Sequence, residues 1–140
     1  MEFCSEEYLN KVMEISNNDE KFVKAASDQN TTYTYIIEPE PDKGIKEKIV
    51  IGYKIQNGKI VEIWRGERET EFTVSGKYGV WVDLLTGKLG VTKAILTRKL
   101  KTKGDKVKLL KYSKAAKRWV EILRGIPTEF HGEYASRSIK

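Results

Sequence analysis

The spacing of apolar residues changes along the chain and thereby predicts its elements. In the first thirty residues the apolar positions recur every three to four residues, as on one face of a helix. The first of these stripes consists of Tyr8, Leu9, Val12 and Met13. It predicts a helix over residues 6–17 with Ser5 as its N-cap, and Asp19 is expected to cap a second helix that runs to about Gln29.

Beyond these helices the spacing changes to the alternation that is typical of strands. Four strands are expected, over residues 31–38, 47–56, 59–65 and 71–76. Asn57 and Gly58 separate the second strand from the third and predict a tight hairpin, because both positions tolerate positive φ. Gly52 in the middle of the second strand predicts a bulge or a close approach by another group.

Short helices and one more strand are expected after the fourth strand. Trp81, Leu84 and Leu85 lie three to four residues apart and share a helical face, and Gly87 ends that helix. A second short helix is expected over residues 91–97. Residues 99–103 alternate lysine with other residues, which is typical of a strand with one charged face.

The last element is ambiguous from the pattern alone. Asp105 is a suitable cap for a helix that ends before Gly125 and that breaks near Ser113. Its apolar stripe consists of Leu109, Tyr112, Ala116, Trp119, Val120 and Leu123. The alternative is a hairpin that pairs residues 99–103 with 106–111 through Gly104 and Asp105.

Composition favours one globular domain. The 140 residues are 39% hydrophobic and 33% charged, and we expect a single domain over residues 1–127 followed by a loose tail over 128–140. No apolar run approaches the roughly 20 residues of a membrane span. The acidic N-terminus lacks the apolar core of a secretory signal, and a single cysteine, Cys4, excludes an internal disulfide. A cytoplasmic location is therefore expected.

Charge is distributed unevenly along the chain. Residues 1–71 hold 10 Lys and Arg against 15 Asp and Glu, whereas residues 72–140 hold 16 against 5. The basic second half suits the headgroups of an anionic membrane, or a nucleic acid, although a solvated lysine-rich face explains it equally well. A nucleic-acid or polyanion-binding module would use Lys99, Lys101, Lys103, Lys106, Lys108, Lys111, Lys114, Lys117 and Arg118. No recognised nucleic-acid motif accompanies these residues, so this alternative is the weaker one.

The chain contains few residues of the kinds that carry catalysis. Its one histidine, His131, stands in the polar tail, far along the sequence from Cys4, so a Cys–His pair is improbable. No cluster of His and Cys has metal-ligand spacing, and neither Gly76-Lys77 nor Gly87-Lys88 belongs to a phosphate-binding loop. We therefore expect no enzyme, no metal and no cofactor.

The order of short motifs in the second half resembles a known family. Gly87, Lys88 and Leu89 end one helix, and roughly a dozen residues later a basic strand leads into a Gly-Asp turn. The residues of this second motif are Lys99, Leu100, Lys101, Lys103, Gly104 and Asp105. This order resembles the sterol carrier protein type 2 family of lipid-binding domains. The chain departs from the family at Gly90-Val91, where Asp-Pro is usual, and at Arg98, where Gly is usual.

The resemblance implies both a fold and a function. The fold would be α/β (α+β), with a five-stranded, largely antiparallel sheet covered on one face by helices. The resemblance also favours the helix over the hairpin after Asp105. The function would be to bind, and transfer, a fatty acyl, acyl-CoA, isoprenoid or sterol-like ligand in an apolar cavity without catalysis. The expected lining is Trp81, Leu84, Leu85, Leu89, Ile95, Leu96, Leu100, Leu110, Trp119 and Leu123. An accessory subunit that presents a lipid to an enzyme is a further alternative.

Overall fold

A five-stranded sheet forms the centre of the computed structural model, which describes residues 1–140. Its strands are β1 (Asn30–Glu38), β2 (Ile49–Gln56), β3 (Lys59–Arg65), β4 (Phe72–Lys77) and β5 (Lys101–Lys103). They lie in the order β3-β2-β1-β4-β5, and only the central pair β1–β4 is parallel. The largely antiparallel five-stranded sheet expected from the sequence is thus confirmed.

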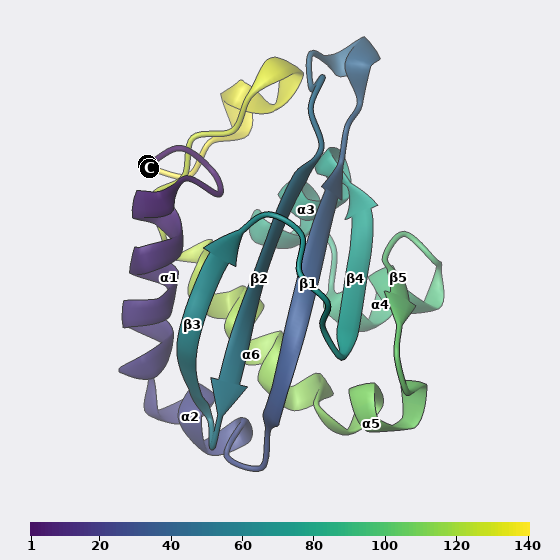
Figure 1. Cartoon of the computed structure of the whole chain (residues 1–140). Coiled ribbons are helices and arrows are strands. Elements are labelled where there is room, and N and C mark those ends of the chain that lie inside the picture. Colours follow the sequence, from purple (N-terminus) through teal and green to yellow (C-terminus); the bar gives the residue numbers. More distant parts are fainter.

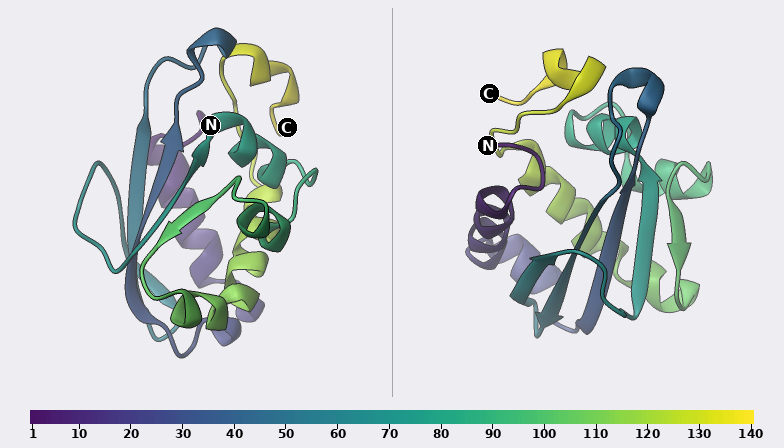
Figure 2. Two further views of the ribbon diagram at one scale, coloured as in Figure 1. Left: turned by 90° about the vertical axis from the view of Figure 1, so that its right-hand side faces the viewer. Right: turned by 45° about the horizontal axis from the view of Figure 1, so that its top comes forward.

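All the helices lie on one face of this sheet, as expected. They are α1 (Glu6–Asn17), α2 (Glu20–Ala25), α3 (Tyr78–Leu85), α4 (Val91–Leu96), α5 (Lys106–Lys111) and α6 (Ser113–Arg124). Figure 1 shows them behind and beside the strands, and the left view of Figure 2 shows the sheet edge-on with the helices on a single side. The connection from β3 to β4, residues 66–71, crosses the opposite face (Figure 2).

The two N-terminal helices begin as their caps predict. The side-chain oxygen of Ser5 accepts a hydrogen bond from the backbone N–H of Tyr8, and the Asp19 carboxylate accepts one from Phe22. The second helix ends at Ala25 rather than near Gln29. Its end packs against the backbone of the β2–β3 turn, where a Cβ on Gly58 would lie only 2.4 Å from a helix carbonyl oxygen. The backbone of this turn therefore lies directly against the last turn of the helix.

The β2–β3 hairpin confirms the Asn57-Gly58 prediction, with φ values of 49° and 82° at the two positions. Gly52 in β2 faces Trp64 across the strand pair, on the face away from the helices. A Cβ at Gly52 would lie 2.6 Å from the indole, so only glycine leaves room for this ring. Arg68 covers the other side of the indole, 4.2 Å from its centroid.

The second half follows the expected order. Residues 106–111 are the helix α5, capped by Asp105, which confirms the favoured helix and excludes the alternative hairpin with residues 99–103. β5 pairs with β4 instead, and it is shorter than predicted. The predicted break at Ser113 is confirmed, because α5 ends at Lys111 and α6 begins at Ser113.

The C-terminal residues are folded back onto the body and are not the loose tail expected from the sequence. Thr128 and Ile139 exchange two backbone hydrogen bonds of 2.8 Å, and Phe130 is only 3% exposed. An Arg137 guanidinium nitrogen donates to Asp83 at 2.8 Å, which anchors this segment to α3. Figure 1 shows the segment beside the N-terminal end of α1. This segment is mostly polar in sequence, yet its two aromatic residues, Phe130 and Tyr134, are buried and complete the core.

The buried apolar residues form one cluster of 34 side chains between the sheet and the helices. The longest helices have 12 residues and carry charges, and no helix of the chain has the length and apolar character that a membrane span requires.

Candidate functional site

A cavity of about 460 Å³ lies between the sheet and the helices α4, α5 and α6. Ligand pockets in proteins typically measure roughly 300–1,000 Å³ and are lined mostly by apolar side chains. Thirteen of the 20 residues that line this cavity are hydrophobic. The volume and the lining therefore suit a hydrophobic small molecule.

The cavity exists because the elements over this half of the sheet are short. α4 and α5 have six residues each, and the three-residue strand β5 lies between them in sequence. Elements of this length carry too few side chains to cover the sheet completely. Leu96 and Leu110 both line the cavity, yet they are 78% and 65% exposed. They stand at its mouth, where the wall is open to solvent.

The floor of the cavity is made of tyrosines from the inner face of the sheet. Tyr33 and Tyr35 come from β1, and Tyr53 comes from β2. The Tyr35 hydroxyl donates to that of Tyr53 at 3.3 Å, and the Tyr33 hydroxyl donates to Gln29 Oε1 at 2.7 Å. Burial raises the pKa of all three phenols well above the ordinary value, so they stay neutral.

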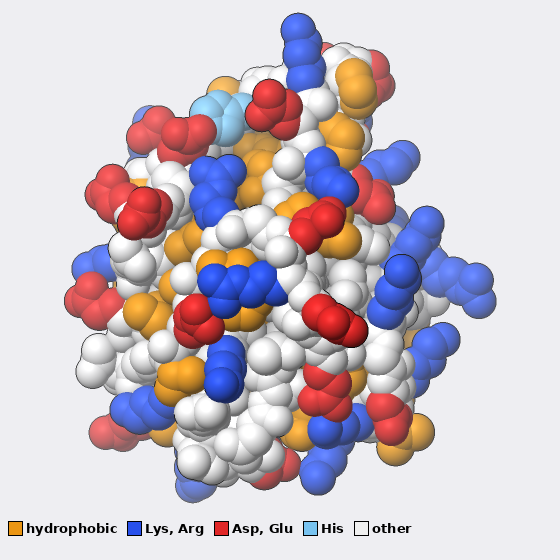
Figure 3. Space-filling model, viewed as in Figure 1, with side chains coloured by type: hydrophobic (Ala, Val, Ile, Leu, Met, Phe, Trp, Pro, Cys, Tyr) orange, Lys and Arg blue, Asp and Glu red, His pale blue; other side chains and the backbone are white.

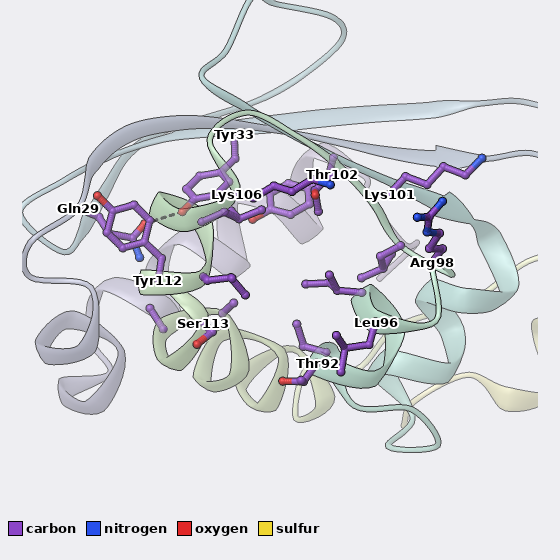
Figure 4. A pocket seen from close by; sticks show the side chains of 18 of the residues that line it. Gln29, Tyr33, Thr92, Leu96, Arg98, Lys101, Thr102, Lys106, Tyr112 and Ser113 are labelled. Atoms are coloured by element: carbon purple, nitrogen blue, oxygen red, sulfur yellow. Dashed lines mark hydrogen bonds between the residues drawn. The ribbon is translucent and has the colours of Figure 1, made fainter.

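One hydrogen-bond donor beside this floor has no partner within the protein. The side chain of Gln29 is buried at one end of the cavity, and its amide nitrogen donates no hydrogen bond. Figure 4 shows Gln29, Tyr33 and Tyr112 together at that end. An oxygen atom of a ligand could accept from this amide.

The opposite end of the cavity is basic. Arg98 and Lys101 line it, Lys106 lies farther along the cavity, and no salt bridge neutralises any of the three. Figure 4 shows Arg98 and Lys101 at the far end from Gln29, with Lys106 reaching along the cavity between them. A chain with an acidic headgroup would thus find apolar contacts inside and positive charge at the mouth.

The structure divides the ten residues of the expected lining into three groups. Ile95, Leu96, Leu100 and Leu110 line the large cavity. Five others surround a separate void of about 40 Å³ beneath α1, α3 and α6, namely Trp81, Leu84, Leu85, Trp119 and Leu123. That space has less than a tenth of the volume of the large cavity, and the five side chains around it are buried against the core. Leu89 is buried but lines neither space.

Sequence reasoning missed the tyrosine floor and the basic mouth. Tyr33, Tyr35 and Tyr53 alternate along their strands, which places them on one face, but alternation does not reveal whether that face meets side chains or empty space. Arg98 adopts φ of 59°, a backbone conformation that the sequence gives no reason to expect for arginine. It lies where the family pattern has glycine.

The remaining candidates for chemistry are metal ligands, His131 and Cys4, and none of them lies in the cavity. The structure contains no group of three or more His, Cys, Asp or Glu side chains that could hold a metal ion. His131 lies 3.2 Å from a Glu2 carboxylate oxygen at the surface. Cys4 is fully buried, and burial raises the pKa of its thiol, which keeps it unreactive.

Solved structures with the same architecture include several sterol carrier proteins. A crystal structure of sterol carrier protein 2 aligns with a TM-score of 0.81 and 23% identity over 89% of this chain and 99% of that one. A conserved hypothetical protein from Thermus thermophilus aligns at 0.78 and 24% over 89% of each chain. Sterol carrier protein 2 from Yarrowia lipolytica aligns at 0.60 and 11% over 86% of this chain and 89% of that one. At these identities the likeness establishes the fold.

A comparison with curated protein sequences finds no match to this chain. The model of the SCP-2 sterol transfer family, by contrast, matches residues 9–117, which include every strand and the entire cavity lining. The chain therefore belongs to the SCP-2 sterol transfer family.

Proposed function

We propose that the protein is a cytoplasmic, non-catalytic carrier of a single-chain amphiphile with an acidic headgroup, such as a fatty acyl, acyl-CoA or isoprenoid phosphate compound. Family membership and the shared fold imply lipid binding or transfer. The observation that supports the finer assignment is the 460 Å³ apolar cavity with Arg98, Lys101 and Lys106 at its mouth. Exchange of this ligand with an anionic membrane belongs to the same proposal.

The energetics of the cavity suit reversible binding. A chain of about ten methylenes gains roughly 8 kcal/mol when it leaves water. Association and ordering cost several kcal/mol, so micromolar binding is expected. A carrier requires this range, because much tighter binding would prevent release of the ligand.

The position of the charges supports an orientation for the ligand. An acid at the basic mouth leaves the alkyl chain to run inward over Leu100 and Ile95 toward the tyrosine floor. Buried carboxylates or phosphates without a partner are costly, whereas at this mouth they keep both water and cationic side chains within reach.

Occlusion of the cavity tests the proposal. Ala116 in α6 lines the cavity and is exposed, so Ala116→Trp would fill ligand space without displacing the core. A fluorescent fatty acid should bind the unmodified protein with micromolar Kd and bind this variant at least about tenfold more weakly, since several methylene contacts are lost. Lys117→Trp, one residue along the same helix but outside the cavity, is the matched control.

Native mass spectrometry of the purified protein gives an independent readout. Co-purified ligand of one or a few masses is expected, and it should be absent from the Ala116→Trp preparation. A protein that is empty as purified and that binds no fatty-acid probe would contradict the proposal, and so would equal probe affinity in Ala116→Trp and Lys117→Trp.

A further inference from the structure

Large hydrophobic side chains are exposed almost exclusively around the cavity mouth. Of the four exposed ones in the whole chain, three are Leu96 (78% exposed), Val107 (79%) and Leu110 (65%); the fourth, Val61, lies on β3. Val107 and Leu110 lie three residues apart on α5 and so share a face. Leu96 ends α4, and it lines the same cavity as Leu110. Together they form an apolar rim.

The segment that contains this rim also carries unpaired positive charge. Residues 91–117 contain ten Lys and Arg and one acidic residue, Asp105, which is engaged in capping α5. Only two of the ten are paired in salt bridges, Lys108 with Glu71 and Lys111 with Asp28. The other eight are Lys93, Arg98, Lys99, Lys101, Lys103, Lys106, Lys114 and Lys117. Figure 3 shows Lys and Arg gathered over the neighbouring edge at β5 and α4.

We infer that this mouth surface, defined as the rim of Leu96, Val107 and Leu110 with its eight unpaired cations, docks on an anionic lipid bilayer. Apolar tips inserted among headgroups, with lysines around them, are the arrangement by which peripheral proteins bind such membranes. A soluble polyanion offers phosphates but no apolar layer, and it leaves the exposed leucines and valine unexplained. The inference rests on the proposed carrier function and adds the site at which the carrier meets its membrane.

Docking in this orientation places the cavity in direct contact with the bilayer. Leu96 and Leu110 belong both to the rim and to the cavity lining. A chain can therefore pass from the acyl region into the cavity without crossing water, while its acidic head remains near Arg98 and Lys101. Transfer through the same surface that binds the membrane follows from this continuity.

Val107 separates docking from ligand binding, because it belongs to the rim but does not line the cavity. Flotation with phosphatidylcholine vesicles, with and without 30% phosphatidylglycerol, measures docking, and the fatty-acid probe without vesicles measures cavity binding. Val107→Ser should weaken binding to the anionic vesicles about tenfold, because the burial of one valine is lost. It should leave probe affinity unchanged. Val61→Ser, the one exposed valine outside the rim, should change neither quantity.

Two double variants test the contribution of the unpaired cations in the same way. Lys103→Gln with Lys114→Gln should weaken binding to anionic vesicles roughly 25-fold, at about fivefold for each lysine near the membrane. Lys21→Gln with Lys54→Gln removes the same charge from exposed positions elsewhere and should have little effect. None of these four lysines lines the cavity.

Three results would overturn the inference. The first is equal vesicle binding by Val107→Ser and Val61→Ser, and the second is equal binding to neutral and anionic vesicles. The third is heparin or DNA binding that loses affinity in the Lys103→Gln, Lys114→Gln variant while Val107→Ser binds vesicles as tightly as the unmodified protein. The last result would identify a polyanion surface. Failure of the carrier function appears differently, as intact docking with no probe or native ligand in the cavity.

Discussion

The hydrogen bond between Tyr33 and Gln29 is a buried polar contact in the wall of a mostly apolar cavity. The Tyr33 hydroxyl donates to Gln29 Oε1 at 2.7 Å, and both side chains are buried. Such a bond contributes little to stability as long as it is made, but a single buried partner left without it costs roughly 1–3 kcal/mol. Its net effect can therefore be measured only by removing both groups.

We predict that Gln29→Leu lowers the free energy of unfolding by about 1–3 kcal/mol, because the buried Tyr33 hydroxyl loses its acceptor. Adding Tyr33→Phe to this variant should recover most of the loss, since both polar groups are then gone. Urea unfolding of the two single variants and the double variant forms the test. If the losses of the two single variants simply add, the pair is not coupled and this interpretation of the contact is wrong.

Residue types alone did not reveal which apolar side chains border empty space. Trp81 and Leu84 have the same helical spacing as residues that line cavities, yet they surround a void of only 40 Å³. Trp81 is held there because its indole N–H donates to the Gly76 and Ile36 carbonyl oxygens, at 3.1 and 3.3 Å. These partners are 5 and 45 residues away, so no local pattern could have shown the arrangement.

At the scale of elements, an ion pair connects the N-terminal helices to α6. Both oxygens of the Asp19 carboxylate accept hydrogen bonds from the Arg118 guanidinium, at 2.7 and 2.9 Å, and one of them also caps α2. The guanidinium, followed by the hydrogen bond from Phe22, lowers the pKa of Asp19 to about 2. This carboxylate therefore links folding of the N-terminal helices to pH.

The sign of the pH dependence follows from the lowered pKa. In the unfolded chain Asp19 titrates at its ordinary pKa of 3.8, whereas in the folded protein it stays charged down to about pH 2. The stabilisation is therefore fully present above about pH 4 and is lost as the pH falls toward 2. We predict that Asp19→Asn, which keeps a capping side chain, lowers Tm at pH 7 and that the difference from the unmodified protein vanishes near pH 2.

Glu121→Gln is the control for this prediction. Glu121 also contacts Arg118, at 3.2 Å, but its side chain is 54% exposed, so its substitution should change Tm little. A Tm difference for Asp19→Asn that stays constant from pH 7 to pH 2, measured by circular dichroism, would show that the lost contact is not the charged pair.

Element types and order were largely predictable because caps, turns and periodicity are local. Ser5, Asp19, Asn57-Gly58 and Asp105 each specify a boundary through contacts within a few residues. The hollow between α4 and α5 depends instead on how short elements are placed across the sheet. The sequence indicated a cavity only through its resemblance to a lipid-binding family.

At the scale of the whole molecule, one helical layer has a solid half and a hollow half. α1, α3 and the C-terminal segment pack closely over one end of the sheet, whereas α4 and α5 leave the cavity over the other. The C-terminal segment belongs to the solid half through Phe130, Tyr134 and the Arg137–Asp83 ion pair of 2.8 Å. Loss of the C-terminal segment is therefore expected to lower stability without changing ligand binding.

Removal of residues 128–140 tests this division. The truncation exposes the partners of Phe130, whose ring lies 5.4 Å from Phe3 and 6.4 Å from Tyr78, both buried. Loss of one buried phenylalanine alone costs about 3–5 kcal/mol, so the free energy of unfolding measured in urea should fall by at least that amount. Deletion of the exposed Lys140 alone is the control and should have no effect.

Below its own Tm the truncated protein should still bind the fatty-acid probe with unchanged Kd, because none of the deleted residues lines the cavity. A truncated protein that stays folded but loses the probe would show that the two halves are coupled and that the C-terminal segment shapes the cavity from a distance.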